Sequence, residues 1–318
     1  MPAGRPGYGP HMTRARPPRP EDVEVTRPGK VLFPAAGLTK AGLARHYREV
    51  APAALPLLRG RPLNLQRFPD GVEGGGFMQQ QAGRHFPPWV RRVRVRKAGG
   101  SVEHVVADDA ATLVYLAGQA AITLHAWTSR ADRLDRPDRV IFDLDPSRDD
   151  FDAVRAAALE IGALLRELGL EPFAMLTGSR GVHVVTPVQR RQDHDVVLDF
   201  ARNVAALLVA RDPDGLTLEA RKANRGDRIL VDVMRNAYAH TAVAPYAVRA
   251  LPEAPVATPI PWEELSDAGL SPRRYRVGAL PASLLSDGGP WREMGDRARP
   301  LGPARRRLDA LRTEASVP

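Results

Sequence analysis

The chain has 318 residues, no cysteine and a formal net charge of +9. This length supports one large domain or two small ones, and the lack of cysteine excludes disulfides, thiolate metal sites and cysteine nucleophiles, so metal chemistry must use Asp, Glu or His. No apolar segment approaches the roughly 20 residues of a membrane span, which favours a cytoplasmic protein that joins the nucleoid when on DNA, and the positive charge favours a polyanionic partner such as nucleic acid.

The N-terminal third is predicted to contain a disordered arm and a small module. Residues 1–22 are rich in Pro, Gly and Arg and lack apolar periodicity, as in a disordered basic arm. Residues 23–130 are expected to form an N-terminal α/β module with a helix over residues 39–50. Arginine alternates with valine over residues 90–97, which predicts a strand whose arginine face is either a solvated edge or a nucleic-acid-binding stripe.

A regular succession of elements follows, and residues 131–265 are expected to form the core of a catalytic module. The order is strand, helix, strand, strand, helix, strand, over residues 140–145, 151–170, 173–177, 182–188, 194–211 and 229–234. This is the ferredoxin-like order, whose antiparallel sheet places the third and fourth strands on either side of the first. The fold class is therefore α/β (α+β). Residues 241–249 should be extended, and residues 301–318 should form a basic tail with a short helix over residues 305–312.

Two acidic residues share one face of the first predicted strand. Asp143 and Asp145 are two positions apart, so both point away from the core that Phe142 and Leu144 face. Adjacent carboxylates repel each other unless a cation lies between them. Asp232, on the fourth strand beside the first, completes a three-carboxylate cluster of the kind that suits Mg²⁺ or Mn²⁺.

The three acids allow two interpretations. The cluster can hold two ions, one activating an attacking hydroxyl and the other holding the phosphates and leaving group, which indicates phosphoryl or nucleotidyl transfer. Alternatively, the acids only form salt bridges with Arg139 and Arg228, which lie nearby in the sequence.

The turn between the second and third strands is rich in groups that bind anions. Residues 177–183 read TGSRGVH, in which the glycines let backbone amides approach an anion while Ser179, Arg180 and His183 add side-chain donors. Because the third strand also neighbours the first, these donors should face the acids, as suits a triphosphate. A Gly-rich hairpin turn with a buried histidine is the alternative.

Other candidates are less distinctive in the sequence. Four basic residues flank the strand that carries Asp232 and either neutralise phosphates or lie on the surface: Lys222, Arg225, Arg228 and Arg249. His125 is by default a core histidine. Phe77 and Met78 are either core residues or a platform for base stacking.

These motifs occur in an order that resembles the polymerase domain of bacterial DNA ligase D, a primase-polymerase fold of the archaeo-eukaryotic primase superfamily that serves non-homologous end joining. The resemblance extends over about residues 25–265, within a domain expected over residues 23–300. Its most specific segments are VIFDLDP at 140–146, TGSRGVH at 177–183, VD at 231–232 and APY at 244–246.

The resemblance implies a function for many of these residues. Two Mn²⁺ or Mg²⁺ ions would be held by Asp143, Asp145 and Asp232. The substrate would be an NTP or dNTP, whose triphosphate contacts would come from Ser179, Arg180, His183 and Arg249, with Lys222, Arg225 and Arg228 nearby. Thr177 and His125 match positions near the nucleotide sugar.

The resemblance also implies a DNA-binding surface. Lys30 and Lys40 match lysines that hold the 5′-phosphate at the far side of a gap, and Phe77 matches a phenylalanine that stacks on the template. Several positions of this surface depart from the family pattern: Met78 replaces a second phenylalanine, Gln80 a lysine, Arg27 a short polar residue, and Leu251 an arginine. The DNA-binding surface is thus less similar than the catalytic centre.

The expected activity is template-directed addition of nucleotides at gaps and double-strand ends, with a preference for a downstream 5′-phosphate. With no length left for a ligase or phosphoesterase domain, a stand-alone polymerase working with Ku and a separate ATP-dependent DNA ligase is expected. The rival interpretations are a primase that starts chains without a primer, a non-catalytic nucleic-acid-binding module, and a metal-dependent nuclease.

Overall fold

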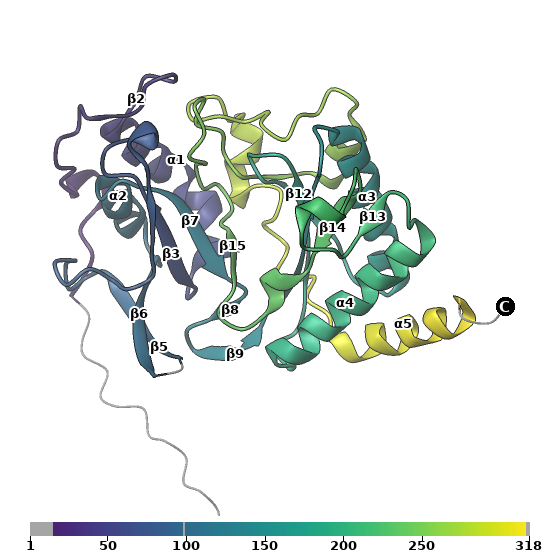
Figure 1. The fold of residues 1–318 in the computed structure, drawn as a ribbon. Coiled ribbons are helices and arrows are strands. Elements are labelled where there is room, and N and C mark those ends of the chain that lie inside the picture. Colours follow the sequence, from purple (N-terminus) through teal and green to yellow (C-terminus); the bar gives the residue numbers. More distant parts are fainter. Residues whose placement is uncertain (1–14, 98, 316–318) are drawn as a thin grey trace, which may run out of the picture.

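The computed structural model describes residues 15–97 and 99–315. Most of the arm predicted over residues 1–22 therefore lies outside the described residues. The described chain is a mixed α+β structure with two six-stranded sheets that lie side by side (Figure 1). No helix in these residues combines the length and apolar character needed to cross a bilayer.

The N-terminal sheet has the strand order β15-β7-β3-β6-β5, with β4 paired to β3. Its elements are β3 (Pro62–Arg67), β4 (Phe77–Gln79), β5 (Arg91–Lys97), β6 (Gly100–Val106), β7 (Ala121–Trp127), β15 (Thr241–Val243), α1 (Lys40–Leu58) and α2 (Ala110–Gly118). Two small two-stranded ribbons accompany it: β1 (Val31–Phe33) with β2 (Leu38–Thr39), and β8 (Ser129–Arg130) with β9 (Arg133–Pro137). The predicted extended segment 241–249 thus contributes β15 to the N-terminal sheet, although it lies more than a hundred residues after the other strands of that sheet.

The second sheet has the order β13-β14-β10-β12-β11-β16 and confirms the ferredoxin-like prediction, because β12 and β14 flank β10. Its elements are β10 (Arg139–Asp145), α3 (Phe151–Glu167), β11 (Phe173–Leu176), β12 (Val182–Pro187), α4 (His194–Arg211), β13 (Leu216–Thr217), β14 (Ile229–Asp232), β16 (Thr258–Ile260) and the C-terminal α5 (Leu301–Ala315). Short 3-10 turns occur at Pro20–Asp22, Val72–Gly74, Lys222–Asn224, Met234–Asn236, Trp262–Ser266, Ala282–Leu284 and Ser286–Gly288.

Strand β10 separates two environments because its side chains alternate between the faces of the sheet. Phe142 and Leu144 are fully buried and pack in the same hydrophobic cluster as residues of α3 and α4. Ile141 lies on the other face and belongs to the core of the N-terminal module. Asp143 and Asp145 share this second face, so both point toward the space between the two modules.

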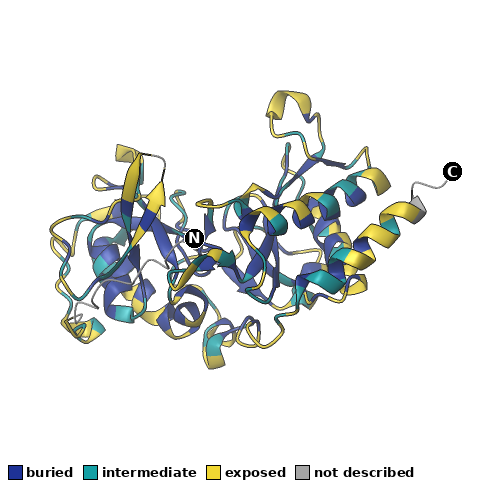
Figure 2. Cartoon of the chain, turned by 90° about the horizontal axis from the view of Figure 1, so that it is seen from below, coloured by how far each residue is buried: buried dark blue, intermediate teal, exposed yellow. Residues whose placement is uncertain are grey.

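Two helices, α1 and α5, are longer than predicted. Helix α1 begins as expected after its cap, where Gly42 N donates to Thr39 Oγ1 at 3.2 Å, but it continues to Leu58 through Pro52 and Pro56. A proline inside a helix removes a hydrogen bond and crowds the preceding turn. Here the second half of α1 is mostly buried in the core, and its apolar contacts stabilise the helix despite the prolines. Figure 2 shows how buried residues fill the interior of both modules.

Helix α5 begins at Leu301, before the short helix predicted over residues 305–312. Leu301, Ala304 and Leu308 are buried in the hydrophobic cluster that packs against the second sheet. Arg307 Nη1 also donates to Leu168 O at 2.8 Å. The described part of the C-terminal segment is therefore a docked amphipathic helix.

Candidate active site

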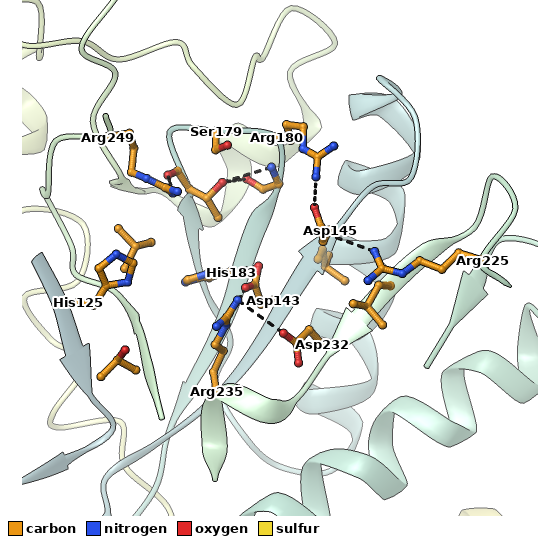
Figure 3. Close-up of a pocket in the computed structure, with 16 residues that line it drawn as sticks. His125, Asp143, Asp145, Ser179, Arg180, His183, Arg225, Asp232, Arg235 and Arg249 are labelled. Carbon is orange, nitrogen blue, oxygen red and sulfur yellow. Dashed lines mark hydrogen bonds and ion pairs between the residues drawn. The ribbon is translucent and has the colours of Figure 1, made fainter. Parts of the chain in front are cut away.

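A polar cavity of about 380 Å³ lies between the two modules. Strands β10, β12 and β14 form one wall, and β7 and β15 contribute the opposite wall (Figure 3). Except for Lys222 and Arg228, every predicted metal or nucleotide ligand lines it: His125, Asp143, Asp145, Thr177, Ser179, Arg180, His183, Arg225, Asp232 and Arg249.

Strand register places Asp143 at the centre of the cavity. Asp143 is directly opposite Asp232 across β10 and β14, and opposite His183 across β10 and β12. Its Oδ1 lies 3.3 Å from His183 Nε2, and its Oδ2 accepts a 3.0 Å hydrogen bond from Arg235 Nε. Burial alone would raise the pKa of Asp143, but His183 and Arg235 outweigh it and hold this pKa well below its usual range. Asp143 is therefore ionised throughout the physiological pH range.

The other two acids are also matched to cationic groups. Asp145 accepts hydrogen bonds from Arg180 Nη2 at 3.0 Å and Arg225 Nη1 at 3.3 Å. Asp232 Oδ1 accepts from the backbone amide of Met234 at 2.8 Å, and its Oδ2 lies 3.6 Å from Arg235 Nη2. The pocket thus carries a row of carboxylates whose charge is balanced by arginines.

Arg139 and Arg228, which the sequence suggested as salt-bridge partners of the three acids, do not contact them. Arg139 donates from Nε to Asp138 at 3.2 Å, at the other end of β10. Arg228 donates to the carbonyl oxygens of Arg225 and Asn224, so it braces its own loop. The specific salt bridges proposed with Arg139 and Arg228 are therefore wrong.

The acids have the chemistry that a divalent cation needs. Within the described ranges, no three His, Asp or Glu side chains are already grouped as a metal-ligand set. Asp143, Asp145 and Asp232 nevertheless line one cavity, supply hard oxygen donors and each attract positive charge. Mg²⁺ and Mn²⁺ prefer such donors. The three residues therefore fit a divalent cation once the contacting guanidinium groups move aside.

The turn after β11 is held in a shape that requires glycine. Gly178 has a φ of +66°, which disfavours any other residue, and a Cβ at Gly181 would collide with the carbonyl oxygen of Leu144 on β10. The Thr177 hydroxyl closes the turn by donating to Gly181 O at 3.0 Å and accepting from Gly181 N at 3.2 Å. The Gly181 amide is therefore used by the turn itself and is not among the backbone amides that remain available to an anion.

Arg249 links this turn to the cavity. Its Nη1 donates to Thr177 O at 2.6 Å, and Ser179 and Arg180 lie at the rim of the same cavity (Figure 3). On the opposite wall, His125 is paired with Val243 across β7 and β15. Burial, and then the nearby positive charge of Arg249, lower the pKa of His125 to about 3. The imidazole is therefore neutral at physiological pH.

The structure also corrects the set of basic residues. Lys222 is exposed in the Lys222–Asn224 turn and lies outside the cavity, as does Arg228. Arg235 lines the cavity and contacts two of its acids, but the sequence did not single it out. The one available signal was its position three residues after Asp232, which is weak in a chain so rich in arginine.

A second cavity, of about 470 Å³, brings together the two lysines predicted to bind a 5′-phosphate. The β1–β2 ribbon places Lys30 and Lys40 on this cavity beside Arg27 and Arg67. Lys30 Nζ donates to Asp70 at 2.9 Å, and Lys40 Nζ donates to a backbone carbonyl at 2.9 Å. Burial, followed by the charges of Lys30 and Arg27, lowers the pKa of Lys40. The cavity is basic, but it also contains a carboxylate, Asp70, that the sequence analysis did not predict there.

The candidate base-stacking residues are on β4. Phe77 and Met78 are 49% and 51% exposed, which excludes the core interpretation of either side chain. The Arg67 guanidinium lies 5.6 Å from the centre of the Phe77 ring. Both residues are therefore available to a partner at the surface.

Comparison with known proteins shows the family of the chain. Residues 39–291 match the model of the LigD primase-polymerase domain. The chain belongs to this family. A LigD from Mycolicibacterium smegmatis, described as a multifunctional non-homologous end joining protein, is 31% identical over 260 residues, which is 81% of this chain and 34% of that protein. LigD from Mycobacterium tuberculosis H37Rv is 32% identical, over 80% of this chain and 34% of the relative.

A solved structure has the same fold as this LigD family member. The polymerase domain of Mycobacterium tuberculosis Ligase D, in complex with DNA, superposes with a TM-score of 0.81 at 29% identity and covers 87% of this chain and 99% of that domain. The chain spans about a third of the length of the mycobacterial LigD proteins. The family resemblance and the fold class predicted from the sequence are confirmed.

Proposed function

We propose that this chain is a template-directed nucleotidyltransferase that adds nucleotides to 3′-ends at gaps and broken DNA ends in non-homologous end joining. The supporting observation is a cavity in which Asp143 and Asp232 face each other beside the arginine-lined turn after β11. A nuclease would need the acids but would leave the turn and Arg249 without a purpose. A non-catalytic module would need neither.

We assign the divalent-ion ligands to Asp143, Asp145 and Asp232. Two Mg²⁺ or Mn²⁺ ions, when bound, would activate the primer hydroxyl and neutralise phosphate charge. His183 is only 3% exposed and packs against Asp143, so its role is to orient that carboxylate. This differs from the direct triphosphate contact that the family resemblance implied.

The triphosphate is proposed to bind at the turn after β11, where Ser179, Arg180 and Arg249 line the cavity. In the transfer, the primer 3′-oxygen forms a bond to the α-phosphorus and the bond to the pyrophosphate breaks. The guanidinium groups stabilise the charge that develops on the leaving group. The neutral imidazole of His125 can exchange hydrogen bonds with a sugar hydroxyl, which is compatible with either an NTP or a dNTP.

The DNA is proposed to lie over the N-terminal module. Lys30, Lys40 and Arg27 would receive a 5′-phosphate on the downstream strand, and Phe77 with Met78 would pack against template bases. Ku and a separate ATP-dependent DNA ligase are the proposed partners in end joining. Binding of gapped DNA would then place a primer terminus at the cavity between the modules.

Primer extension on gapped DNA tests the function. We expect the parent protein to extend a labelled primer with Mn²⁺ or Mg²⁺, and Asp232→Asn to lose extension while still binding DNA, because the basic surface is unchanged. Asp214→Asn, at an exposed position outside the cavity, is the matched control and should extend like the parent. Near-parental extension by Asp232→Asn contradicts the proposal, and synthesis on a template without primer would indicate a primase.

A further inference from the structure

Arg235 lies directly over the facing pair of acids at the centre of the cavity. Its Nε donates to Asp143 Oδ2 at 3.0 Å, and its Nη2 lies 3.6 Å from Asp232 Oδ2 (Figure 3). Arg180 and Arg225 instead contact Asp145. Among the arginines that line the cavity, Arg235 is therefore the one that bridges the two acids on neighbouring strands.

The backbone that carries Arg235 is held against β10. The adjacent Asn236 is fully buried and donates from Nδ2 to Ile141 O at 2.7 Å, while its Oδ1 accepts from Ile141 N at 2.8 Å. These two hydrogen bonds anchor the Met234–Asn236 turn to β10 next to Asp143. The position of the Arg235 Cα is therefore fixed by the fold, whereas its side chain is 39% exposed and has room to move.

The contacts of Arg235 are those that a metal ion would make. Asp143 and Asp232 face each other across a strand pair, and two facing carboxylates repel unless a cation lies between them. A guanidinium remains charged at all physiological pH values and its forked donors suit two carboxylates. The two carboxylates that Arg235 contacts are two of the three that would hold the divalent ions.

We propose that Arg235 is an internal counter-ion that competes with divalent metal ions for the Asp143–Asp232 pair. This inference rests on the metal ligands assigned in the proposed function. The guanidinium keeps the two acids together when no metal is bound, and it must swing away before both carboxylates can ligate an ion. Arg235 thereby raises the concentration of divalent ions at which the site becomes occupied.

Mn²⁺ binding to the protein alone, measured by EPR titration without DNA or nucleotide, tests this competition. Arg235→Gln keeps a polar side chain but removes the charge, so Mn²⁺ should bind at least about tenfold more tightly than to the parent. Arg202→Gln is the control, because Arg202 is exposed and contacts Met234 of the same turn without touching the acids. It should bind Mn²⁺ like the parent.

Two further measurements locate the effect. The double variant Arg235→Gln, Asp232→Asn should lose the gain in affinity, and a gain that persists would place the extra Mn²⁺ elsewhere and overturn the proposal. In thermal unfolding, Mn²⁺ should raise the Tm of Arg235→Gln more than that of the parent, because a tighter ligand stabilises the folded state more. This second readout detects the effect even if the variant is less stable without metal.

Equal or weaker Mn²⁺ binding by Arg235→Gln overturns the proposal, as does the absence of measurable binding in all variants. Because no polymerisation is involved, failure here is distinguishable from failure of the proposed function. A parent that extends primers while Arg235→Gln binds Mn²⁺ unchanged refutes only the competition. A parent that binds Mn²⁺ through the acid pair but never extends primers refutes only the polymerase.

Discussion

Each carboxylate in the cavity lies beside at least one guanidinium or imidazole group. The basic residues of the cavity differ in whether they contact an acid or the turn after β11. His183 contacts Asp143 and is almost completely buried, so we expect it to act on a substrate mainly by orienting that acid. Arg249 donates directly to Thr177 O in the turn after β11, where we propose that the triphosphate binds. We therefore expect these two basic residues of the same cavity to have separable effects on kinetics.

We predict that Arg249→Ala raises the nucleotide KM, whereas His183→Ala mainly lowers kcat. A hydrogen bond to a charged group contributes about 1.5–3 kcal/mol, so each effect should be about ten- to a hundredfold. Steady-state extension with varied nucleotide concentration separates the two parameters.

The control is Lys222→Ala, since Lys222 lies outside the cavity, and it should have parental kinetics. If His183→Ala changes KM as Arg249→Ala does, then His183 contacts nucleotide and the positioning role is wrong.

At the scale of elements, the β1–β2 ribbon and the start of α1 bring Lys30 and Lys40 to one cavity. Lys40 N donates to Lys30 O at 2.8 Å, which fixes the two backbones beside each other. Asp70 already neutralises part of this charge through its contact with Lys30. A 5′-phosphate would have to compete with Asp70 for the lysine.

We predict that gapped DNA binds more tightly with a downstream 5′-phosphate, and that the Lys30→Ala, Lys40→Ala double variant loses this difference. Asp70→Asn should enlarge the difference, because it removes the competing carboxylate and with it a repulsion of the phosphate. Fluorescence anisotropy at two salt concentrations measures both effects.

Lys97→Ala removes a charge on the exposed strand β5 and should keep the full preference for phosphate. Equal affinity of the parent for phosphorylated and unphosphorylated gaps would leave the cavity as a general basic surface.

At the scale of the whole molecule, the fold keeps two buried histidines, His46 and His125, uncharged. His46 on α1 is 2% exposed and donates from Nε2 to Tyr246 O at 3.0 Å, on the segment that follows β15. Burial lowers the pKa of His46 to about 4 and, with nearby arginine charge, that of His125 to about 3. Both groups are neutral in the folded protein.

We predict that the free energy of unfolding falls as the pH is lowered from about 6.5 toward 4. In this window the unfolded chain protonates these histidines while the folded chain does not, so each contributes up to about 1.4 kcal/mol per pH unit. The low pKa of Asp143 acts in the same sense as that of the histidines, but its contribution is lost only below about pH 4, the usual range of an aspartate.

Urea denaturation at several pH values measures this slope, and His46→Gln should reduce it whatever its effect on stability at neutral pH. An unchanged slope in that variant would show that His46 is protonated in the folded state.

Much of the catalytic sheet was determined by the sequence itself. The alternation of Phe142 and Leu144 with Asp143 and Asp145 decides which face of β10 carries the acids, because the side-chain period of a strand is two. The order of strands and helices then restricts the sheet to a topology in which the strand of Asp232 neighbours β10. These features depend on local periodicity and on general rules of connection, which a sequence displays directly.

Only the tertiary structure decided which basic residues contact the three acids. An arginine side chain is long and flexible, so the carboxylate it reaches depends on where distant backbone segments lie. Arg235 reaches Asp143 because Asn236 anchors its turn to β10, while Arg139 and Arg228, which are also near an acid in the sequence, bond elsewhere. In a chain this rich in arginine, neither composition nor spacing can distinguish them, because the distinction arises from contacts between residues far apart along the chain.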